Sequence, residues 1–286
     1  MARKIYCQAT SKWLELPDFC QRIVSFSPSV SESIIQMGLG DILKGISVYC
    51  VHPSEKIREG RYIVGSYASY KKDVIQKINP DLIFTTTGYQ LEFARKLSDT
   101  YPVYAVRLPL TVSDLISTCV EVGIVCGYYQ NSFDLQKRLL SSLAQYVNQD
   151  DVSIKEKIKV YVEIDLGGPV TFGAYSYITD ALNFVGFENI FGNFPAEWLK
   201  PEPDFVRQNE PDVIIYEPKM FRKSRDIQKI KESLISRFGD LKAIRNNRVF
   251  VTPGIYDFLA HHGPSFIYRV FPFLVEIRQK LLLDSI

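Results

Sequence analysis

Arg22-Ile-Val-Ser-Phe-Ser-Pro-Ser-Val-Ser-Glu32 is the most informative stretch of this 286-residue chain. Its first five residues are mostly apolar and β-branched, which is typical of a buried parallel strand. Ser27-Pro28-Ser29 ends that strand, and the spacing from Ser29 to Glu32 predicts a capping box for a helix over 30–37. Gly38 then ends the helix. The stretch therefore predicts a strand, a loop and a helix, the repeating unit of an α/β fold.

Strands and helices continue to alternate outward from this stretch. A β-hairpin is expected before it, from Lys4–Cys7 and Trp13–Leu16. Further strands are expected over 46–49, 82–85, 103–106, 160–164, 213–216 and 248–251, and helices over 71–78, 91–97, 111–127, 130–148, 177–185, 227–238 and 265–283. This alternation predicts an α/β fold with central parallel sheets.

Two similar segments indicate that the chain has two lobes of one design. Asp73-Val-Ile-Gln-Lys-Ile-Asn-Pro-Asp-Leu-Ile83 and Asp204-Phe-Val-Arg-Gln-Asn-Glu-Pro-Asp-Val-Ile214 share the same order of acid, short helix, Pro-Asp break and apolar strand. Chance recurrence of a common helix–strand junction is the alternative. We expect an N-terminal lobe with the hairpin over 1–127, a linking helix over 128–150 and a C-terminal lobe over 151–286.

Composition and charge exclude several classes of protein. The chain is 46% hydrophobic, which excludes a disordered protein. Its net charge of +2 is too small to indicate a surface that binds DNA or RNA. No apolar run is typical of a membrane span or a signal peptide. From the given sequence we therefore expect a cytoplasmic protein. If a leader sequence is missing from it, we expect a cell-surface or periplasmic protein. Five cysteines without a C-x-x-C pair favour buried thiols, with a Cys7–Cys20 bridge possible in an oxidising compartment.

Nothing in the sequence favours catalysis. Three histidines, His52, His261 and His262, leave few general bases, and Gly167-Gly168 lacks the context of a nucleotide-binding loop. We therefore expect no enzyme, no catalytic cofactor and no protein-held metal.

The opening stretch, followed by Gly38-Leu-Gly-Asp41, resembles the start of the substrate-binding proteins that serve ABC importers of vitamin B12 and iron siderophores (class III), and is closest to their cobalamin-binding members. Tyr49-Cys-x-x-Pro53, Val64-Gly-Ser66 and the two Pro-Asp segments continue the resemblance across nearly the whole chain. It implies two α/β lobes joined by one long helix and a ligand held between them. It also implies a non-enzymatic receptor whose ligand we expect to be cobalamin.

The resemblance carries a set of ligand-binding positions onto this chain. Tyr49 follows the second strand, and Tyr67 and Trp198 each stand six residues before a lobe acid, where cobalamin binders have tryptophan. Thr86 falls at another tryptophan position, for which nearby Tyr89 could substitute. Asp257 matches an acid before the last helix, whereas His261 replaces an arginine. The expected ligand-binding residues are Tyr49, Tyr67, Tyr89, Trp198, Asp257 and His261.

The same resemblance implies a partner and leaves alternatives open. Asp73 and Asp204 match the acids that meet an ABC-transporter permease, although both could simply favour helix starts. A ferric siderophore or haem is the alternative ligand, with Arg107, Arg222 and Lys223 as candidate basic contacts. A corrinoid-handling accessory protein inside the cell, without a transporter, is the other alternative. We expect a monomer with no nucleic-acid partner.

Overall fold

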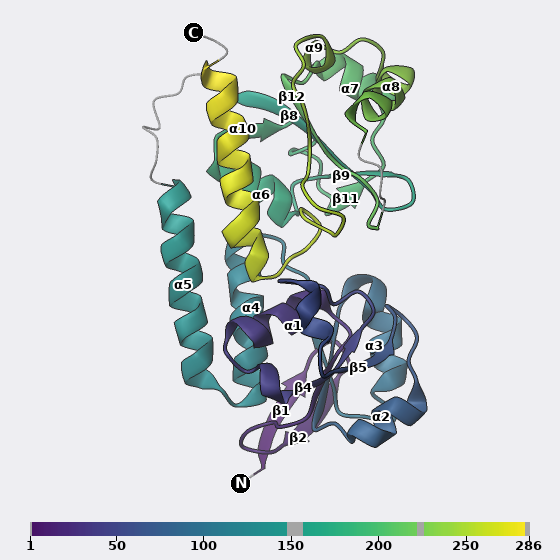
Figure 1. Ribbon diagram of the computed structural model, residues 1–286, viewed down its shortest axis with the longest axis vertical. Coiled ribbons are helices and arrows are strands. Elements are labelled where there is room, and N and C mark those ends of the chain that lie inside the picture. The colour runs from purple at the N-terminus through teal and green to yellow at the C-terminus, as the bar shows by residue number, and fades with distance from the viewer. Residues whose placement is uncertain (1, 148–156, 222–225, 284–286) are drawn as a thin grey trace. The chain divides into compact units, whose positions relative to one another are not determined.

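A computed structural model describes residues 2–147, 157–221 and 226–283, and the chain forms two compact units. Unit 1 contains residues 1–109, 113–141 and 262–265, and unit 2 contains residues 110–112, 142–261 and 266–286. Each unit is a sheet covered by helices, as Figure 1 shows, so the predicted two-lobed α/β fold is confirmed. The long helix α5 (Tyr129–Val147) carries the chain from unit 1 into unit 2.

Unit 1 is built on a five-stranded parallel sheet in the order β5-β4-β3-β6-β7. Helices α1 and α4 lie on one side of it and α2 and α3 on the other (Figure 1). The strands are β3 (Ile23–Ser25), β4 (Leu43–Ser47), β5 (Tyr62–Gly65), β6 (Leu82–Thr86) and β7 (Val103–Val106). The helices are α1 (Pro28–Gln36), η1 (Gly40–Ile42), η2 (Glu55–Arg58), α2 (Lys72–Ile78), η3 (Gly88–Gln90), α3 (Leu91–Leu97) and α4 (Val112–Cys126).

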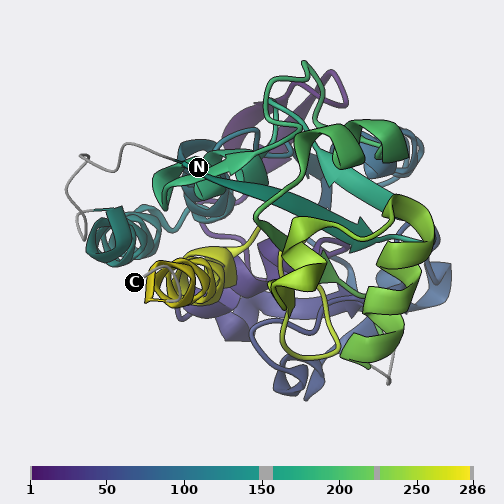
Figure 2. The same ribbon diagram turned by 90° about the horizontal axis from the view of Figure 1, so that it is seen from above.

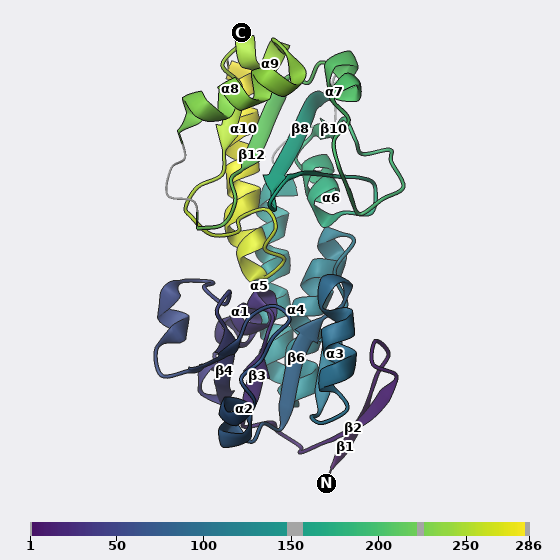
Figure 3. The ribbon, with the colours of Figure 1, turned by 90° about the vertical axis from the view of Figure 1, so that its right-hand side faces the viewer.

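The predicted hairpin is present as β1 (Arg3–Cys7) paired with β2 (Lys12–Leu16). Strand β1 contacts β7, where the Ala105 N–H donates to Cys7 Sγ at 3.4 Å. Figure 3 shows the hairpin at the edge of unit 1. Cys20 bonds through its main chain to Cys126, and a Cys7–Cys20 bridge in an oxidising compartment remains a prediction. All five cysteines are buried and unbridged in the structure.

Unit 2 has a mixed sheet in the order β11-β9-β8-β12-β13, with β10 paired to β8. Strands β8 (Ile158–Asp165), β12 (Val213–Glu217), β13 (Val249–Val251) and β10 (Phe187–Asn189) are parallel, whereas β9 (Pro169–Phe172) and β11 (Trp198–Leu199) run antiparallel to their neighbours. The helices are α6 (Tyr177–Phe184), α7 (Pro203–Asn209), α8 (Ile227–Phe238), α9 (Lys242–Arg245), a π-helical turn (Phe266–Val270) and α10 (Phe271–Leu283).

The core of unit 2 lies between this sheet and its helices. Tyr161 and Ile214 are adjacent on β8 and β12 and pack with Val206 of α7 and Phe238 of α8. Helix α10, seen nearly end-on in Figure 2, lies on the other side of the sheet from α7 and α8. No helix in the described ranges is both long and apolar enough to span a bilayer.

The two Pro-Asp segments occupy equivalent places in the two units. Helices α2 and α7 each end in a left-handed residue, Asn79 or Glu210. In unit 1 the Asp81 N–H donates to the Arg22 carbonyl at 2.9 Å, and in unit 2 the Asp212 N–H donates to the Lys159 carbonyl, also at 2.9 Å. The repeat in the sequence therefore marks one junction, built twice, that holds a helix end against the first central strand of each sheet.

The predicted capping box at the start of α1 is wrong. Ser27, not Ser29, is the N-cap, because Pro28 provides the first helical residue and the Val30 N–H donates to Ser27 Oγ at 3.5 Å. The Glu32 carboxylate is fully buried and accepts hydrogen bonds from the main-chain N–H (3.0 Å) and the hydroxyl of Ser265. Glu32 therefore binds the segment at 262–265 rather than the start of its own helix.

Other differences from the sequence predictions concern short elements. The strand expected over 46–49 lies at Leu43–Ser47, and β5, β9, β10 and β11 were not expected. Part of the predicted linking range, 148–150, and the first part of the predicted C-terminal lobe, 151–156, lie outside the described residues, as do Arg222 and Lys223.

Candidate binding site

Three tyrosines follow three strands of the unit 1 sheet at the same edge. Tyr49, Tyr67 and Tyr89 come two or three residues after the ends of β4, β5 and β6. Tyr67 is the middle ring: its centroid lies 5.4 Å from that of Tyr49 and 6.2 Å from that of Tyr89, both in edge-to-face geometry. Because the carboxyl ends of parallel strands meet at one edge, these rings form a continuous aromatic surface, which we call the tyrosine row.

Glycines shape the turns that carry two of these rings. Gly65 has φ +155°, and a Cβ there would lie 2.0 Å from the Ser69 carbonyl oxygen. Gly88 has φ +68°, and its Cβ would lie 2.5 Å from Leu108 Cδ1. Larger residues would therefore displace the turns before Tyr67 and Tyr89. Tyr89 is 84% exposed, so its ring is open to a ligand, whereas Thr86 is buried. That Tyr89 takes the place of a ring at position 86 remains a prediction.

Gln90 holds the tyrosine row in place and was not singled out in the sequence. Its side chain is 1% exposed, and its Nε2 donates to the main-chain carbonyls of Tyr67 at 2.8 Å and Phe26 at 3.3 Å. Its Oε1 accepts from Thr86 N at 3.0 Å and Thr86 Oγ1 at 2.9 Å. One amide thus joins the loops after β3, β5 and β6, and no local sequence signal marks it.

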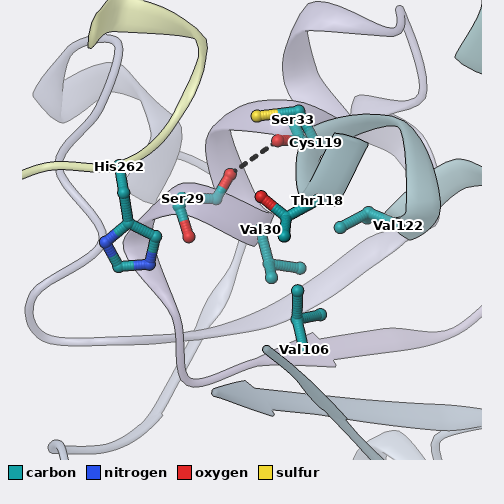
Figure 4. Close-up of a pocket in the computed structure, with 8 residues that line it drawn as sticks. All are labelled: Ser29, Val30, Ser33, Val106, Thr118, Cys119, Val122 and His262. Carbon is teal, nitrogen blue, oxygen red and sulfur yellow. Dashed lines mark hydrogen bonds between the residues drawn. The ribbon is translucent and has the colours of Figure 1, made fainter. Parts of the chain in front are cut away.

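Unit 1 also contains a small cavity, lined by residues including Ser29, Thr118, Cys119 and His262 (Figure 4). Its volume is about 10 Å³, which is space for one water molecule at most. A drug-sized ligand needs a pocket of several hundred cubic ångströms. This cavity is therefore too small to hold a corrinoid or haem, and the tyrosine row is the surface of unit 1 at which ligand binding remains predicted.

A buried carboxylate organises the corresponding edge of unit 2. Glu217, the last residue of β12, is 1% exposed. Its Oε1 accepts from the Phe258 N–H at 3.2 Å and its Oε2 from the Leu259 N–H at 2.5 Å. Burial raises the pKa of this carboxyl to about 7, although the hydrogen bonds from the loop oppose the shift. An acid ending the apolar run 213–216 is the sequence signal that could have identified it.

The loop that Glu217 holds carries two of the predicted ligand residues. Asp257 is half-buried, and loss of solvation raises its pKa, while the nearby charge of His261 lowers it. His261 itself is only 3% exposed and lies close enough to Asp257 to interact with it electrostatically. The structure thus pairs these two residues with each other, and their contact with a ligand remains a prediction.

Trp198 lies apart from this loop, on the antiparallel strand β11 opposite Phe172 of β9. Its side chain is 63% exposed, so its ring is largely available to a ligand. The basic candidate Arg107 is exposed in unit 1 and forms an ion pair with Asp114 at 3.6 Å. Contact of the exposed Trp198 ring with a ligand therefore remains a prediction.

The two acids predicted to meet a permease have the same local setting. Asp73 and Asp204 are exposed and lie in the first turns of α2 and α7, where carboxylates favour the helix dipole. Asp204 also pairs with Arg207 on its own helix. A favourable interaction with the helix dipole is thus enough to explain an acid at both positions. The role of Asp73 and Asp204 in docking to a permease remains a prediction.

Among residues 2–147, 157–221 and 226–283, no group of three or more His, Cys, Asp or Glu side chains could hold a metal ion. This finding concerns the described residues alone.

Comparison with known proteins identifies the family of this chain. The sequence profile of the periplasmic binding proteins matches residues 23–256, and the chain therefore belongs to that family of substrate-binding proteins. A vitamin B12-binding protein of Vibrio parahaemolyticus is 22% identical over 236 residues, covering 80% of each chain.

Solved structures share the fold. The vitamin B12-binding protein BtuF of Vibrio cholerae superposes with a TM-score of 0.69 at 17% identity, over 92% of this chain and 98% of that one. The haem-binding protein RhuT of Roseiflexus sp. RS-1 superposes with a TM-score of 0.74 at 18% identity, over 91% of this chain and 99% of that one. The same architecture thus occurs in binders of two different metal complexes, and the expectation that this chain stays in the cytoplasm finds no support among these periplasmic proteins.

Proposed function

We propose that this chain captures a corrinoid of the vitamin B12 type and delivers it to an ABC importer from outside the cytoplasmic membrane. The observation that carries the proposal is the tyrosine row, three rings in edge contact after β4, β5 and β6. Flat macrocycles are bound well by aromatic faces, and the relatives named for vitamin B12 binding support this ligand.

The available ring surface is sufficient for useful affinity. Each tyrosine or tryptophan can bury about 150–250 Å², worth at most about 4–6 kcal/mol at about 25 cal/mol per Å². Loss of translational and rotational freedom costs about 4–15 kcal/mol. The three rings of unit 1 therefore support micromolar binding, and Trp198 is a further predicted contact. Asp257 and His261 would add polar contacts at the edge of the ligand.

Calorimetric and visible-absorbance titrations with cyanocobalamin, haemin and a ferric catecholate test the proposal directly. We expect saturable one-to-one binding of cyanocobalamin and no saturable response to the other two. A response to haemin or the ferric complex alone would replace the corrinoid with the alternative ligand class. Absence of binding to all three compounds would refute the proposal that the protein captures a metal complex of this kind.

Haem is the second candidate ligand, because the haem-binding RhuT has the same architecture over nearly its whole length. Tyrosine can also act as an axial ligand to haem iron. A haem bound through Tyr67 would show a charge-transfer band that disappears in Tyr67→Phe. A corrinoid packed against the ring face would bind Tyr67→Phe almost as well as the unmodified protein.

The proposed delivery step requires contact with a permease through Asp73 and Asp204. Exposed ion pairs contribute only about 0.2–1 kcal/mol each, so docking depends on several such contacts. We expect the ligand-loaded protein to stimulate the ATPase of its cognate ABC importer, and the Asp73→Ala/Asp204→Ala double variant to lose most of that stimulation. No stimulation by the unmodified protein would favour an accessory role without a transporter.

A further inference from the structure

Cys20 and Cys126 lie side by side in unit 1, although 105 residues separate them in the chain. The Cys20 N–H donates to the Cys126 carbonyl at 3.0 Å, and the two thiols are within hydrogen-bonding reach of each other. A disulfide requires Cα atoms roughly 4.4–6.8 Å apart, so the two residues must be close neighbours. The shared main-chain hydrogen bond makes Cys20 and Cys126 such neighbours.

Arg3 gives this pair a polarised environment. Its Nη2 lies 4.0 Å from Cys20 Sγ and donates to the Val125 carbonyl at 3.0 Å, while its Nη1 donates to the Ile124 carbonyl at 3.3 Å. The hydrogen bond from Cys126, together with the charge of Arg3, lowers the pKa of Cys20. The same hydrogen bond raises the pKa of Cys126. This asymmetry favours Cys20 as the attacking thiolate and Cys126 as the second thiol.

A surface groove lies next to both cysteines. It has a volume of about 390 Å³ and is lined by Arg3, by Asp18 and Phe19 just before Cys20, and by Gly127 and Tyr128 just after Cys126. The sulfurs themselves are buried, so oxidation is expected mainly as the chain folds or when this edge of unit 1 opens.

From this geometry we infer that Cys20 and Cys126 form a structural disulfide when the chain folds in an oxidising compartment. With oxidised glutathione as the oxidant, the Cys20 thiolate attacks one sulfur, forms a mixed disulfide and releases one glutathione thiolate. Cys126 loses its proton and attacks the Cys20 sulfur, which forms the protein disulfide and releases the second glutathione thiolate. Two protein thiols are oxidised, and one glutathione disulfide is reduced to two thiols.

The bond would join the segment after the hairpin to the end of α4. Cross-linking a loop of about 100 residues stabilises a domain mainly through its unfolded state, and for a unit of this size this corresponds to a rise in melting temperature of about 5–10 °C. The inference does not depend on the ligand, because the pair lies at neither the tyrosine row nor the loop held by Glu217.

Thiol counting and peptide mapping after refolding in a glutathione buffer test the inference. The unmodified protein should fall from five titratable thiols to three, lose two mass units, yield one peptide linked through Cys20 and Cys126, and melt about 5–10 °C higher than when reduced. Cys126→Ser should retain all its remaining thiols. Cys7→Ser is the matched control, since Cys7 lies against Ala105, and it should still lose two.

Two results would overturn the inference. Retention of five thiols by the unmodified protein, under conditions that oxidise a reference disulfide protein, would show that the pair does not close. A linked peptide joining Cys7 and Cys20 would assign the bond to a different pair. Both results come from the unmodified protein, so they stand even if a serine variant fails to fold.

Discussion

The loops at the carboxyl edges of the two sheets are held by different chemical groups. In unit 1 the neutral amide of Gln90 fixes the loops beneath the tyrosine row. In unit 2 the carboxyl group of Glu217 fixes the loop that carries Asp257 and His261. The first support is insensitive to pH, whereas the second titrates near neutrality. One edge therefore presents an aromatic surface on a support that does not titrate, and the other presents polar groups on a support that does.

Loss of the amide in unit 1 should have the largest effect. Gln90→Leu leaves the carbonyls of Phe26 and Tyr67 and the N–H of Thr86 without their present partner. Buried polar groups left unsatisfied cost about 1–3 kcal/mol each before relaxation, so we expect the free energy of unfolding to fall by about 3–4 kcal/mol. Urea denaturation measures this loss. Gln228→Leu on the exposed face of α8 is the control, and an equal loss in both variants would contradict the account.

The carboxyl group in unit 2 should make stability depend on pH. Its folded pKa of about 7 exceeds the ordinary value of 4.5, so between these values the folded protein keeps a proton that the unfolded chain releases. The free energy of unfolding should therefore fall by about 3 kcal/mol as pH rises from 4.5 to 7, and stay level above that.

Denaturation at several pH values, compared with Glu217→Gln, isolates this dependence. The variant cannot ionise at this position, so the difference between the two curves should show the slope. Glu188→Gln, at the exposed middle position of β10, should retain the slope of the unmodified protein. Parallel curves for the unmodified protein and Glu217→Gln would mean that Glu217 does not titrate in this range.

Removal of the middle ring should weaken binding more than it weakens folding. Tyr67→Leu removes the ring that contacts both Tyr49 and Tyr89, so we expect the Kd for cyanocobalamin to rise about 30- to 100-fold, or about 2–3 kcal/mol. Calorimetry measures the change. Tyr62→Leu is a matched control, because Tyr62 is exposed at the opposite, amino end of β5 and should leave Kd unchanged.

Much of this organisation was predictable from the sequence, because it depends on local patterns. Apolar runs indicated β3, β6 and β12, and the two Pro-Asp segments indicated a duplicated junction. The strands that were missed are short: β10 has three residues, and β11 has two and pairs antiparallel. Periodicity carries little information over so few residues.

The parts that were not predictable depend on contacts between distant residues. Gln90 binds the Phe26 carbonyl across 64 positions, and Glu32 binds Ser265 across 233. A spacing rule assigned Glu32 to a capping box because that rule considers only one helix. The pairing of Cys20 with Cys126 is likewise set by the packing of unit 1 and not by the spacing of the cysteines.

Removal of Trp198, the aromatic residue of unit 2 in the predicted site, should have the smallest effect of these changes. Trp198→Ala removes one exposed indole, and we expect Kd for cyanocobalamin to rise at least tenfold, or about 1.4 kcal/mol. Trp13→Ala provides the control, since Trp13 is 67% exposed on the hairpin and its ring centroid lies 5.2 Å from that of Tyr6, with the two rings tilted. An unchanged Kd in Trp198→Ala would remove Trp198 from the site and leave binding to unit 1.

The most direct test of corrinoid capture is anomalous X-ray diffraction, at the cobalt absorption edge, from crystals grown with cyanocobalamin. We expect one strong cobalt peak, with the corrin ring against Tyr67 and in contact with Tyr49 and Tyr89. A cobalt peak away from the tyrosine row, or crystals without cobalt at saturating ligand, would contradict it.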